Sequence, residues 1–171
     1  MKRILTIIVL IAVGVPLLLS CAFEVQETEY AIVLFFGDPV RIILEPGLAW
    51  KLPPPFETVV RIDKQLRILD PPEAEYLTLD KKNVLVDTFA AWEVEDPLRY
   101  LVTVLDRDTA EAQLEDIMRA EVGAAMGSHD LSALLSTQED QIQVDRIVGT
   151  ITERAAAKAS EGYGIRVRAI R

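Results

Sequence analysis

The chain has few of the residues that form most catalytic, metal-binding and cross-linked sites. It contains one cysteine, Cys21, and one histidine, His129, among 171 residues. A single cysteine excludes an internal disulfide, and one histidine without a nearby thiol argues against a zinc site of three or four ligands. No glycine-rich phosphate loop is present either, since Gly162-Tyr163-Gly164 is typical of a helix end. We therefore predict no metal, no cofactor and no catalytic residue.

Basic charge is also scarce. The sequence has 18 Lys and Arg against 27 Asp and Glu, a formal net charge of −9. Nucleic-acid binding requires a basic surface, so nucleic acid is excluded as a partner. The acidic balance also argues against strong docking onto anionic lipid headgroups, but it does not affect the insertion of apolar side chains into a membrane.

A long uncharged apolar run at the N-terminus is the most prominent feature that the chain does have. Residues 4–23 carry no charge and follow Met1-Lys2-Arg3. At ~1.5 Å per residue, a helix of this length spans a hydrocarbon core of ~30 Å. The basic pair is expected on the cytoplasmic side. The pattern predicts a single-pass membrane anchor over residues 1–23, with the remaining domain in the periplasm or another extracytoplasmic space.

Two other interpretations of this run stay open. A cleaved signal peptide would have a shorter apolar core and a small-x-small cleavage site. A lipoprotein signal would use Leu18-Leu19-Ser20-Cys21 as its lipobox, with Cys21 as the lipid attachment residue.

The residues after the anchor change from strand-like to helix-like patterns. Turns at Gly37-Asp38-Pro39 and Glu45-Pro46-Gly47 separate apolar runs and predict a hairpin. The clearest strand covers residues 83–95, because its apolar residues alternate with period 2. Asp96-Pro97 then predicts a helix start. We expect further strands at residues 30–36, 40–44, 48–52, 57–63, 65–69 and 165–170, with residues 57–63 and 65–69 as a pair, and longer helices starting near Asp108 and Thr137.

This order predicts an α+β fold in which the helices pack on one face of a largely antiparallel sheet. The prolines of Asp70-Pro71-Pro72 suggest a division of the domain. We predict a hairpin-rich, membrane-proximal part over residues 24–72 and a strand-plus-helix part over residues 73–171.

Several segments, in this order, resemble the SPFH family, also called the band 7 or prohibitin homology family. The similarity is greatest to its HflC branch of bacterial protease modulators. It covers nearly the whole chain after the anchor. The segments are Tyr30-Ala31-Ile32-Val33-Leu34-Phe35-Phe36-Gly37, Glu45-Pro46-Gly47-Leu48-Ala49-Trp50-Lys51-Leu52-Pro53, the strand starting at Lys81-Lys82-Asn83 with its following Asp96-Pro97 turn, and Gly162-Tyr163-Gly164-Ile165.

The resemblance implies a non-enzymatic scaffold in the bacterial inner membrane. Its implied partners are an HflK-like subunit and an FtsH-type AAA+ protease, together with membrane lipid, in a hetero- or homo-oligomer. Members of the family continue into a long coiled coil, whereas this sequence stops at Arg171. We therefore expect a fragment or a short member, and assembly through the coiled coil stays in question.

Apolar side chains near the anchor are the candidate functional residues. Aromatic rings suit the membrane interface, and the loop Pro53-Pro54-Pro55-Phe56 is stiff and apolar. Core packing is the alternative. We predict membrane contact by Phe35, Phe36, Trp50, Pro54 and Phe56.

Two alternative functions remain. The first is a lipid-domain organiser of the stomatin or prohibitin kind, without a dedicated protease. The second is a hydrolase that uses Ser128 or the carboxylates of Glu93 and Glu95. A Ser128-His129-Asp130 triad is disfavoured, since adjacent side chains on a turn are expected to point apart.

Overall fold

The computed structural model describes residues 21–134 and 140–171. The predicted anchor therefore lies almost wholly outside the described residues, and its last residues, Ala22 and Phe23, form the start of a strand. Over residues 21–134 and 140–171, no helix combines the length and the apolar character that a membrane crossing requires. The chain divides into two compact units, which we call unit 1 (through Lys64) and unit 2 (from Gln65).

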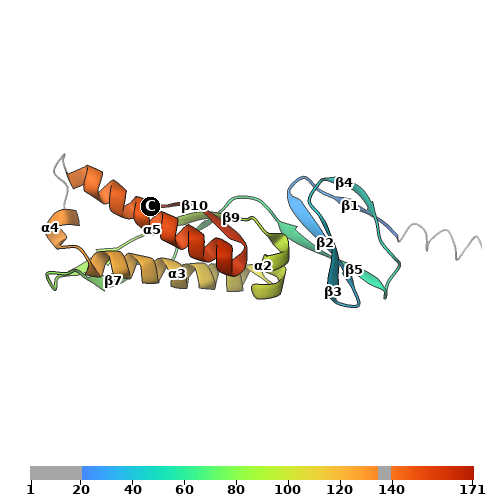
Figure 1. The fold of residues 1–171 in the computed structure, drawn as a ribbon, viewed down its shortest axis with the longest axis horizontal. Coiled ribbons are helices and arrows are strands. Elements are labelled where there is room, and N and C mark those ends of the chain that lie inside the picture. Colours follow the sequence, from blue (N-terminus) through green and yellow to red (C-terminus); the bar gives the residue numbers. More distant parts are fainter. Residues whose placement is uncertain (1–20, 135–139) are drawn as a thin grey trace, which may run out of the picture. The chain divides into compact units, whose positions relative to one another are not determined.

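Unit 1 consists of two antiparallel sheets with strand β2 at its centre (Figure 1). Strand β2 pairs with β3 on one side and with β5 on the other, and β1 pairs with β4. Ala31, Ile32 and Val33 in β2 are fully buried. The predicted hairpin of β2 and β3 is confirmed, but its turn is Phe36-Gly37 rather than Gly37-Asp38-Pro39, because Asp38 and Pro39 already pair with β2. The strands are β1 (Ala22–Val25), β2 (Glu29–Phe35), β3 (Asp38–Ile43), β4 (Gly47–Trp50) and β5 (Glu57–Asp63).

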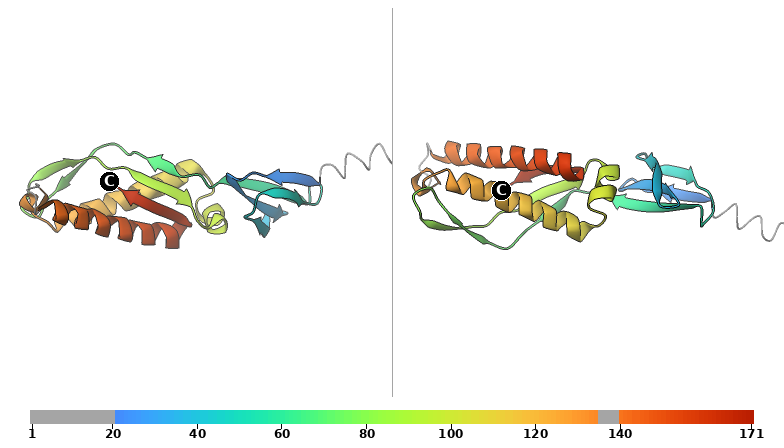
Figure 2. Two further views of the ribbon diagram at one scale, coloured as in Figure 1. Left: turned by 90° about the horizontal axis from the view of Figure 1, so that it is seen from above. Right: turned by 60° about the horizontal axis from the view of Figure 1, so that its bottom comes forward.

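Unit 2 combines two antiparallel sheets with helices, which confirms the predicted α+β class. One sheet has the order β10-β9-β6 and the other pairs β7 with β8. Helices α3 and α5 lie side by side in both views of Figure 2, and α5 packs on β10. The elements are β6 (Arg67–Leu69), β7 (Ala74–Leu77), β8 (Asn83–Val86), β9 (Ala90–Val94), α2 (Pro97–Thr103), α3 (Arg107–Gly127), α4 (Leu131–Leu134), α5 (Asp140–Tyr163) and β10 (Ile165–Ile170).

The single strand predicted over residues 83–95 is wrong in one respect: it is two strands in different sheets. Strand β8 pairs with β7, whereas β9 pairs with both β6 and β10. The alternation of apolar residues continues through the break, so the sequence pattern does not reveal it. The predicted inward face is correct for β9, where Ala90, Trp92 and Val94 are buried.

The expected pairing of residues 57–63 with 65–69 is also wrong. Strand β5 pairs with β2, and β6 pairs with β9 instead, with Arg67 opposite Trp92. Strand β6 thus belongs to the sheet of β9 and β10, and the two compact units divide after Lys64. Strand β1 was not predicted, because Ala22 and Phe23 fell within the predicted anchor, and β7 was not predicted either.

A loop fixes the β7–β8 hairpin to the end of α3. The backbone N–H of Leu79 donates to the carbonyl of His129 (3.0 Å), and the N–H of Leu131 donates to the Asp80 carboxylate (3.1 Å). Hydrogen bonds from the Thr78 hydroxyl (2.6 Å) and from Lys82 hold the pKa of Asp80 well below its usual range. The carboxylate therefore stays ionised while it caps α4.

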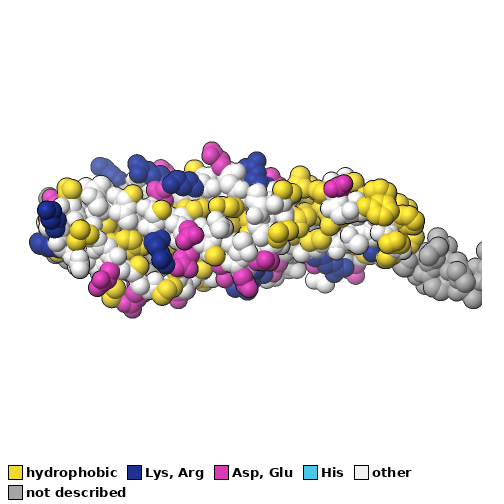
Figure 3. Space-filling model, turned by 90° about the horizontal axis from the view of Figure 1, so that it is seen from below, with side chains coloured by type: hydrophobic (Ala, Val, Ile, Leu, Met, Phe, Trp, Pro, Cys, Tyr) yellow, Lys and Arg dark blue, Asp and Glu magenta, His cyan; other side chains and the backbone are white. Residues whose placement is uncertain are grey.

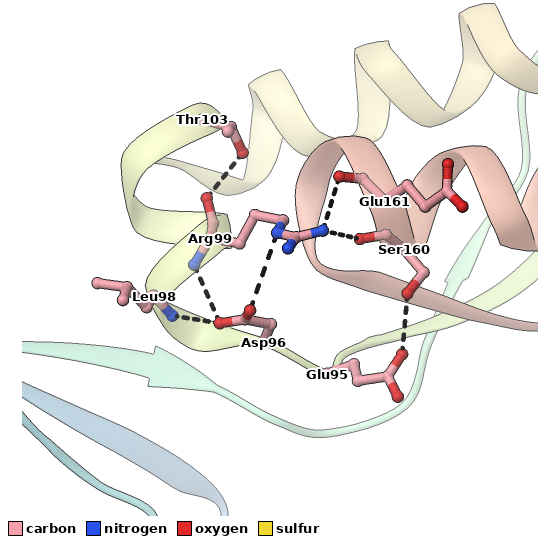
Figure 4. A network of polar contacts seen from close by, with 7 residues as sticks. All are labelled: Glu95, Asp96, Leu98, Arg99, Thr103, Ser160 and Glu161. Carbon is pink, nitrogen blue, oxygen red and sulfur yellow. Dashed lines mark hydrogen bonds and ion pairs between the residues drawn. The ribbon is translucent and has the colours of Figure 1, made fainter.

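The start of α2 and the end of α5 are joined by polar contacts (Figure 4). The Asp96 carboxylate accepts from the N–H groups of Leu98 (3.0 Å) and Arg99 (3.1 Å), which confirms the predicted helix cap. The Arg99 guanidinium donates to the carbonyls of Ser160 (3.2 Å) and Glu161 (2.7 Å) in the last turn of α5. A cation at this position also interacts favourably with the negative end of the helix dipole.

Gly164 ends α5 and redirects the chain into β10. Its φ is +67°, and its carbonyl accepts from the N–H groups of Glu95 (2.9 Å) and Asp96 (3.0 Å). A Cβ at this position would lie 2.5 Å from the carbonyl oxygen of Asp96. Glycine is therefore required here both for its left-handed backbone and for the close approach.

We predict that Gly164→Ala lowers the free energy of unfolding by at least about 1–2 kcal/mol, the cost of a left-handed residue with a Cβ. Gly149→Ala is the matched control. Gly149 lies within α5 with open space around its Cβ position, so alanine should raise stability by about 0.5–1 kcal/mol. Chemical denaturation of the full chain in detergent micelles measures both. Equal effects of the two substitutions would contradict the role given to Gly164.

Candidate functional site

The five side chains that were predicted to contact a membrane all belong to unit 1. We call Phe35, Phe36, Trp50, Pro54 and Phe56 the aromatic tip. All five are exposed, and Phe36 and Trp50 are the most open of the aromatic ones, at 67% and 59% of their surface. Core packing, the alternative for these residues, therefore does not account for Phe36 and Trp50.

The β2–β3 turn positions the first part of the aromatic tip. Phe36 and Gly37 are its two central residues, with φ values of +50° and +98°. Positive φ at both positions is the type I′ geometry that suits the twist of a two-residue hairpin. The Phe36 ring contacts Phe35 and Phe56 edge to face, with centroids 4.8 Å and 5.8 Å apart.

Backbone contacts join Phe56 to the β2–β3 turn and place Trp50 near the start of the described chain. The N–H of Phe36 donates to the carbonyl of Phe56 (3.1 Å), and the N–H of Lys51 donates to that of Cys21 (2.7 Å). Trp50 pairs with Ala22 across β4 and β1. Figure 3 shows hydrophobic side chains gathered at this end of unit 1, where the described residues begin.

Polar contacts hold the loop between Trp50 and Glu57. The Arg41 guanidinium donates to the carbonyl of Trp50, and the N–H of Leu52 donates to the Glu57 carboxylate (2.6 Å). These bonds satisfy backbone groups of a segment whose prolines cannot join a sheet. The loop therefore presents its apolar side chains outward from a fixed backbone.

Phe36 is an unusual choice for its position. A non-glycine residue in the left-handed region costs roughly 1–2 kcal/mol, and asparagine is the residue type that tolerates it best before glycine. Because 67% of the Phe36 surface is exposed, burial in the fold offsets little of this cost. A strained, exposed aromatic side chain points to contact with something outside the chain. From the sequence we expected Phe36 to end a strand, so its left-handed turn conformation was not predicted. The glycine that follows it, Gly37, is the signal that could have indicated a two-residue turn.

Ser128 and His129 lie together, so the expectation that their side chains point apart is wrong. The Ser128 hydroxyl oxygen is 3.0 Å from His129 Nδ1. Both groups also lie against the carbonyl oxygen of Ala125, at 2.9 Å and 2.8 Å. Because a carbonyl only accepts, Nδ1 carries its proton there and cannot take one from Ser128. The pair therefore lacks the base that a serine nucleophile requires.

The carboxylates of Glu93 and Glu95 form ion pairs with the neighbouring strand. Glu93 accepts from Arg168 (2.9 Å), and Glu95 accepts from Arg166. The hydrogen bond from Arg166 lowers the pKa of Glu95, whereas a general acid needs a raised pKa. Within the described ranges, no group of three or more possible metal ligands occurs. The geometry of the aromatic tip thus favours binding to an apolar surface over acid–base chemistry.

Comparison with known proteins gives a family match over most of the chain. The model of the family described as SPFH domain / Band 7 family matches residues 23–171. "Protein HflC" of Vibrio parahaemolyticus is 29% identical over 97% of this chain and 53% of its own length. "Protein HflC" of Vibrio cholerae is 34% identical, over 72% of this chain and 40% of its own length. "Modulator of FtsH protease HflC" of Escherichia coli K12 is 30% identical, over 71% and 39%. The chain thus spans about half the length of these relatives, or less.

We predict that Phe36→Asn changes the free energy of unfolding by less than about 1 kcal/mol, because relief of the left-handed strain offsets the lost ring contacts. Phe36→Val, which is β-branched and poorly tolerated at positive φ, should be clearly less stable than Phe36→Asn. Denaturation curves of the full chain measure the difference. A large loss of stability in Phe36→Asn would mean that the ring serves the fold itself.

Proposed function

Since the chain belongs to the SPFH domain / Band 7 family, we propose that it is a non-enzymatic membrane scaffold that modulates an FtsH-type AAA+ protease. The names of its relatives support this assignment, since one of them is called a modulator of FtsH protease. The observation that carries the membrane part of the proposal is the exposed aromatic tip, of which Trp50 pairs with Ala22, the residue after Cys21.

The proposed location is the bacterial inner membrane, with the N-terminus in the cytoplasm and the domain in the periplasm. The apolar run of residues 4–23 would be the anchor, and the chain enters unit 1 at Cys21, next to Lys51. Anchor and aromatic tip would therefore meet the same bilayer surface. If Cys21 carried a lipid instead, the tip would still face the membrane.

Insertion of the tip would be shallow. Each apolar aromatic side chain that leaves water contributes ~1.5–3 kcal/mol, and tryptophan favours the interface. Asp38 follows Phe36 after Gly37, and Glu57 directly follows Phe56, so their charges would limit the depth of insertion. A protein with a net charge of −9 can use this mode of binding, because it does not depend on attraction to anionic headgroups.

The proposed action is restriction of substrate access. A tether and an inserted tip fix the orientation of the domain, so weak lateral contacts with an HflK-like subunit and with further copies add up through avidity. The assembled domains would limit which membrane proteins reach the protease. The alternative is a stomatin-like or prohibitin-like organiser of lipid domains that has no dedicated protease.

Tryptophan fluorescence tests the membrane contact of the tip, because the chain has two tryptophans, Trp50 and Trp92. In full-length Trp92→Phe, we expect lipids brominated near the headgroup to quench Trp50. In Trp50→Phe, the remaining Trp92, only 1% exposed, should not be quenched. The Trp92 indole N–H has no hydrogen-bond partner among the described residues, so phenylalanine costs no bond there.

A matched pair of further variants tests whether Phe36 holds the tip in the membrane. Phe36 and Leu105 are both bulky, have positive φ (+50° and +69°) and are exposed (67% and 72%). In the Trp92→Phe background, Phe36→Asp should reduce the quenching of Trp50, and Leu105→Asp should leave it unchanged. Unquenched Trp50 in the parent variant would rule out insertion of the tip.

Co-purification tests the proposed partners. We expect the tagged full-length chain, extracted from its native membrane in mild detergent, to recover an AAA+ protease and a second SPFH subunit. Mass spectrometry identifies them, and an unrelated single-pass protein of equal abundance is the control. Recovery of lipid and of the chain's own oligomers alone would contradict the protease role and favour the lipid-organiser alternative.

A further inference from the structure

A pocket between α3 and α5 in unit 2 is separate from the aromatic tip and unused by the proposed function. Its volume is about 160 Å³. Ile147 and Ile151 form part of an apolar wall, and Ser128 and His129 lie at the end of α3. Arg146 and Arg154 complete the side contributed by α5.

The two arginines give the pocket an uncompensated positive charge. Arg146 and Arg154 are eight residues apart on α5, so they share one face of the helix. Among the residues that the structure describes, no ion pair or hydrogen bond engages either guanidinium. By contrast, Arg107, Arg119 and Arg168 each pair with a glutamate.

The one acidic residue of the pocket is already paired. Glu121 is 6% exposed, and its carboxylate lies 2.5 Å from the ammonium of Lys158 on α5. A buried ion pair of this kind neutralises its own charge. The net charge that the pocket offers to a ligand therefore comes from Arg146 and Arg154.

The remaining polar groups of the pocket are occupied within the chain. The Ser128 hydroxyl and His129 Nδ1 both donate to the carbonyl of Ala125, and the Thr150 hydroxyl donates to the carbonyl of Arg146 (3.0 Å). The guanidinium groups are thus the donors left for a ligand. Arginine's planar fork matches a carboxylate with two parallel hydrogen bonds.

We propose that this pocket binds a small organic carboxylate, with its charge on Arg146 and Arg154 and a short apolar body against Ile147 and Ile151. A volume of about 160 Å³ admits a ligand of only a few carbon atoms. A cation would be repelled by the arginines, and a neutral ligand would leave them without a counter-charge. The proposal does not depend on the protease or membrane role.

Titration of the full-length chain in detergent micelles with sodium butyrate tests the proposal. The readout is the set of arginine Nε–H signals in nitrogen–proton NMR spectra, which also shows whether each variant is folded. We expect saturable shifts of the Arg146 and Arg154 signals. Arg146→Gln and Arg154→Gln should each weaken binding about tenfold, the loss of one charged hydrogen-bonding partner.

Arg119→Gln is the matched control, since Arg119 lies on α3, pairs with Glu115 and does not line this pocket. It should leave butyrate binding unchanged. Inorganic phosphate, which has the charge without the apolar body, should bind more weakly than butyrate. The proposal is overturned by butyrate shifts that do not saturate, by equal losses in Arg119→Gln and the two pocket variants, or by phosphate binding as tight as that of butyrate.

Discussion

The left-handed turn at Gly164 is the constraint on which unit 2 depends. Strand β10 can pair with β9 only if the chain reverses immediately after α5, and the carbonyl of Gly164 accepts from Glu95 and Asp96 as it does so. Ala155 and Ala159, both fully buried on α5, allow the helix to approach closely. Trp92 lies on the central strand of the sheet and is almost fully buried. The turn therefore fixes the helices and the sheet together.

Unit 1 has a different organisation. Its most buried residues lie on one central strand, β2, and the turn that follows this strand is exposed. Ala31, Ile32 and Val33 are fully buried in β2, while Phe36 and Gly37, just after the end of the same strand, form a strained, exposed turn. The long ladder of β2 with β5 can tolerate about 1–2 kcal/mol of local strain at its end. The stable strand thus allows an unfavourable, exposed side chain at the tip.

The sequence predicted the local features well and the pairing between distant segments poorly. The cap at Asp96, the helix end at Gly164 and the β2–β3 hairpin were predictable, because each depends on a few adjacent residues with specific backbone preferences. The break between β8 and β9 was not, since an alternating pattern states which face is buried but not which strand is the partner. Strand β6 illustrates the same limit. Its residues, Arg67–Leu69, pair with β9, which lies far along the chain, and no residue near β6 indicates that partner.

The two candidate sites also differ in how much of each the sequence indicates. The five residues of the aromatic tip were chosen from the sequence, because aromatic side chains next to prolines and a turn are easily noticed. The structure adds that these side chains are exposed, and their contact with a membrane stays a prediction. Arg146 and Arg154 were not singled out, since charged residues spaced along a helix are usually a solvated face. Only the structure shows that Glu121, the acid nearest to them in the pocket, is already paired with Lys158.

The two candidate sites share one physical property. Their main side chains are not used in the packing or the ion pairs that hold the fold together. Glu93, Glu95 and Arg168 satisfy each other or their neighbours across β9 and β10, so that polar surface stabilises the sheet and offers little to a ligand. Phe36, in contrast, is strained and exposed, and the guanidinium groups of Arg146 and Arg154 have no partner among the described residues. An exposed side chain with few contacts inside the fold contributes little to stability and remains accessible to a contact outside the chain. Binding at the tip would be apolar and binding at the pocket ionic, and because the residues of the two sites lie in different compact units, each can be altered without changing the other.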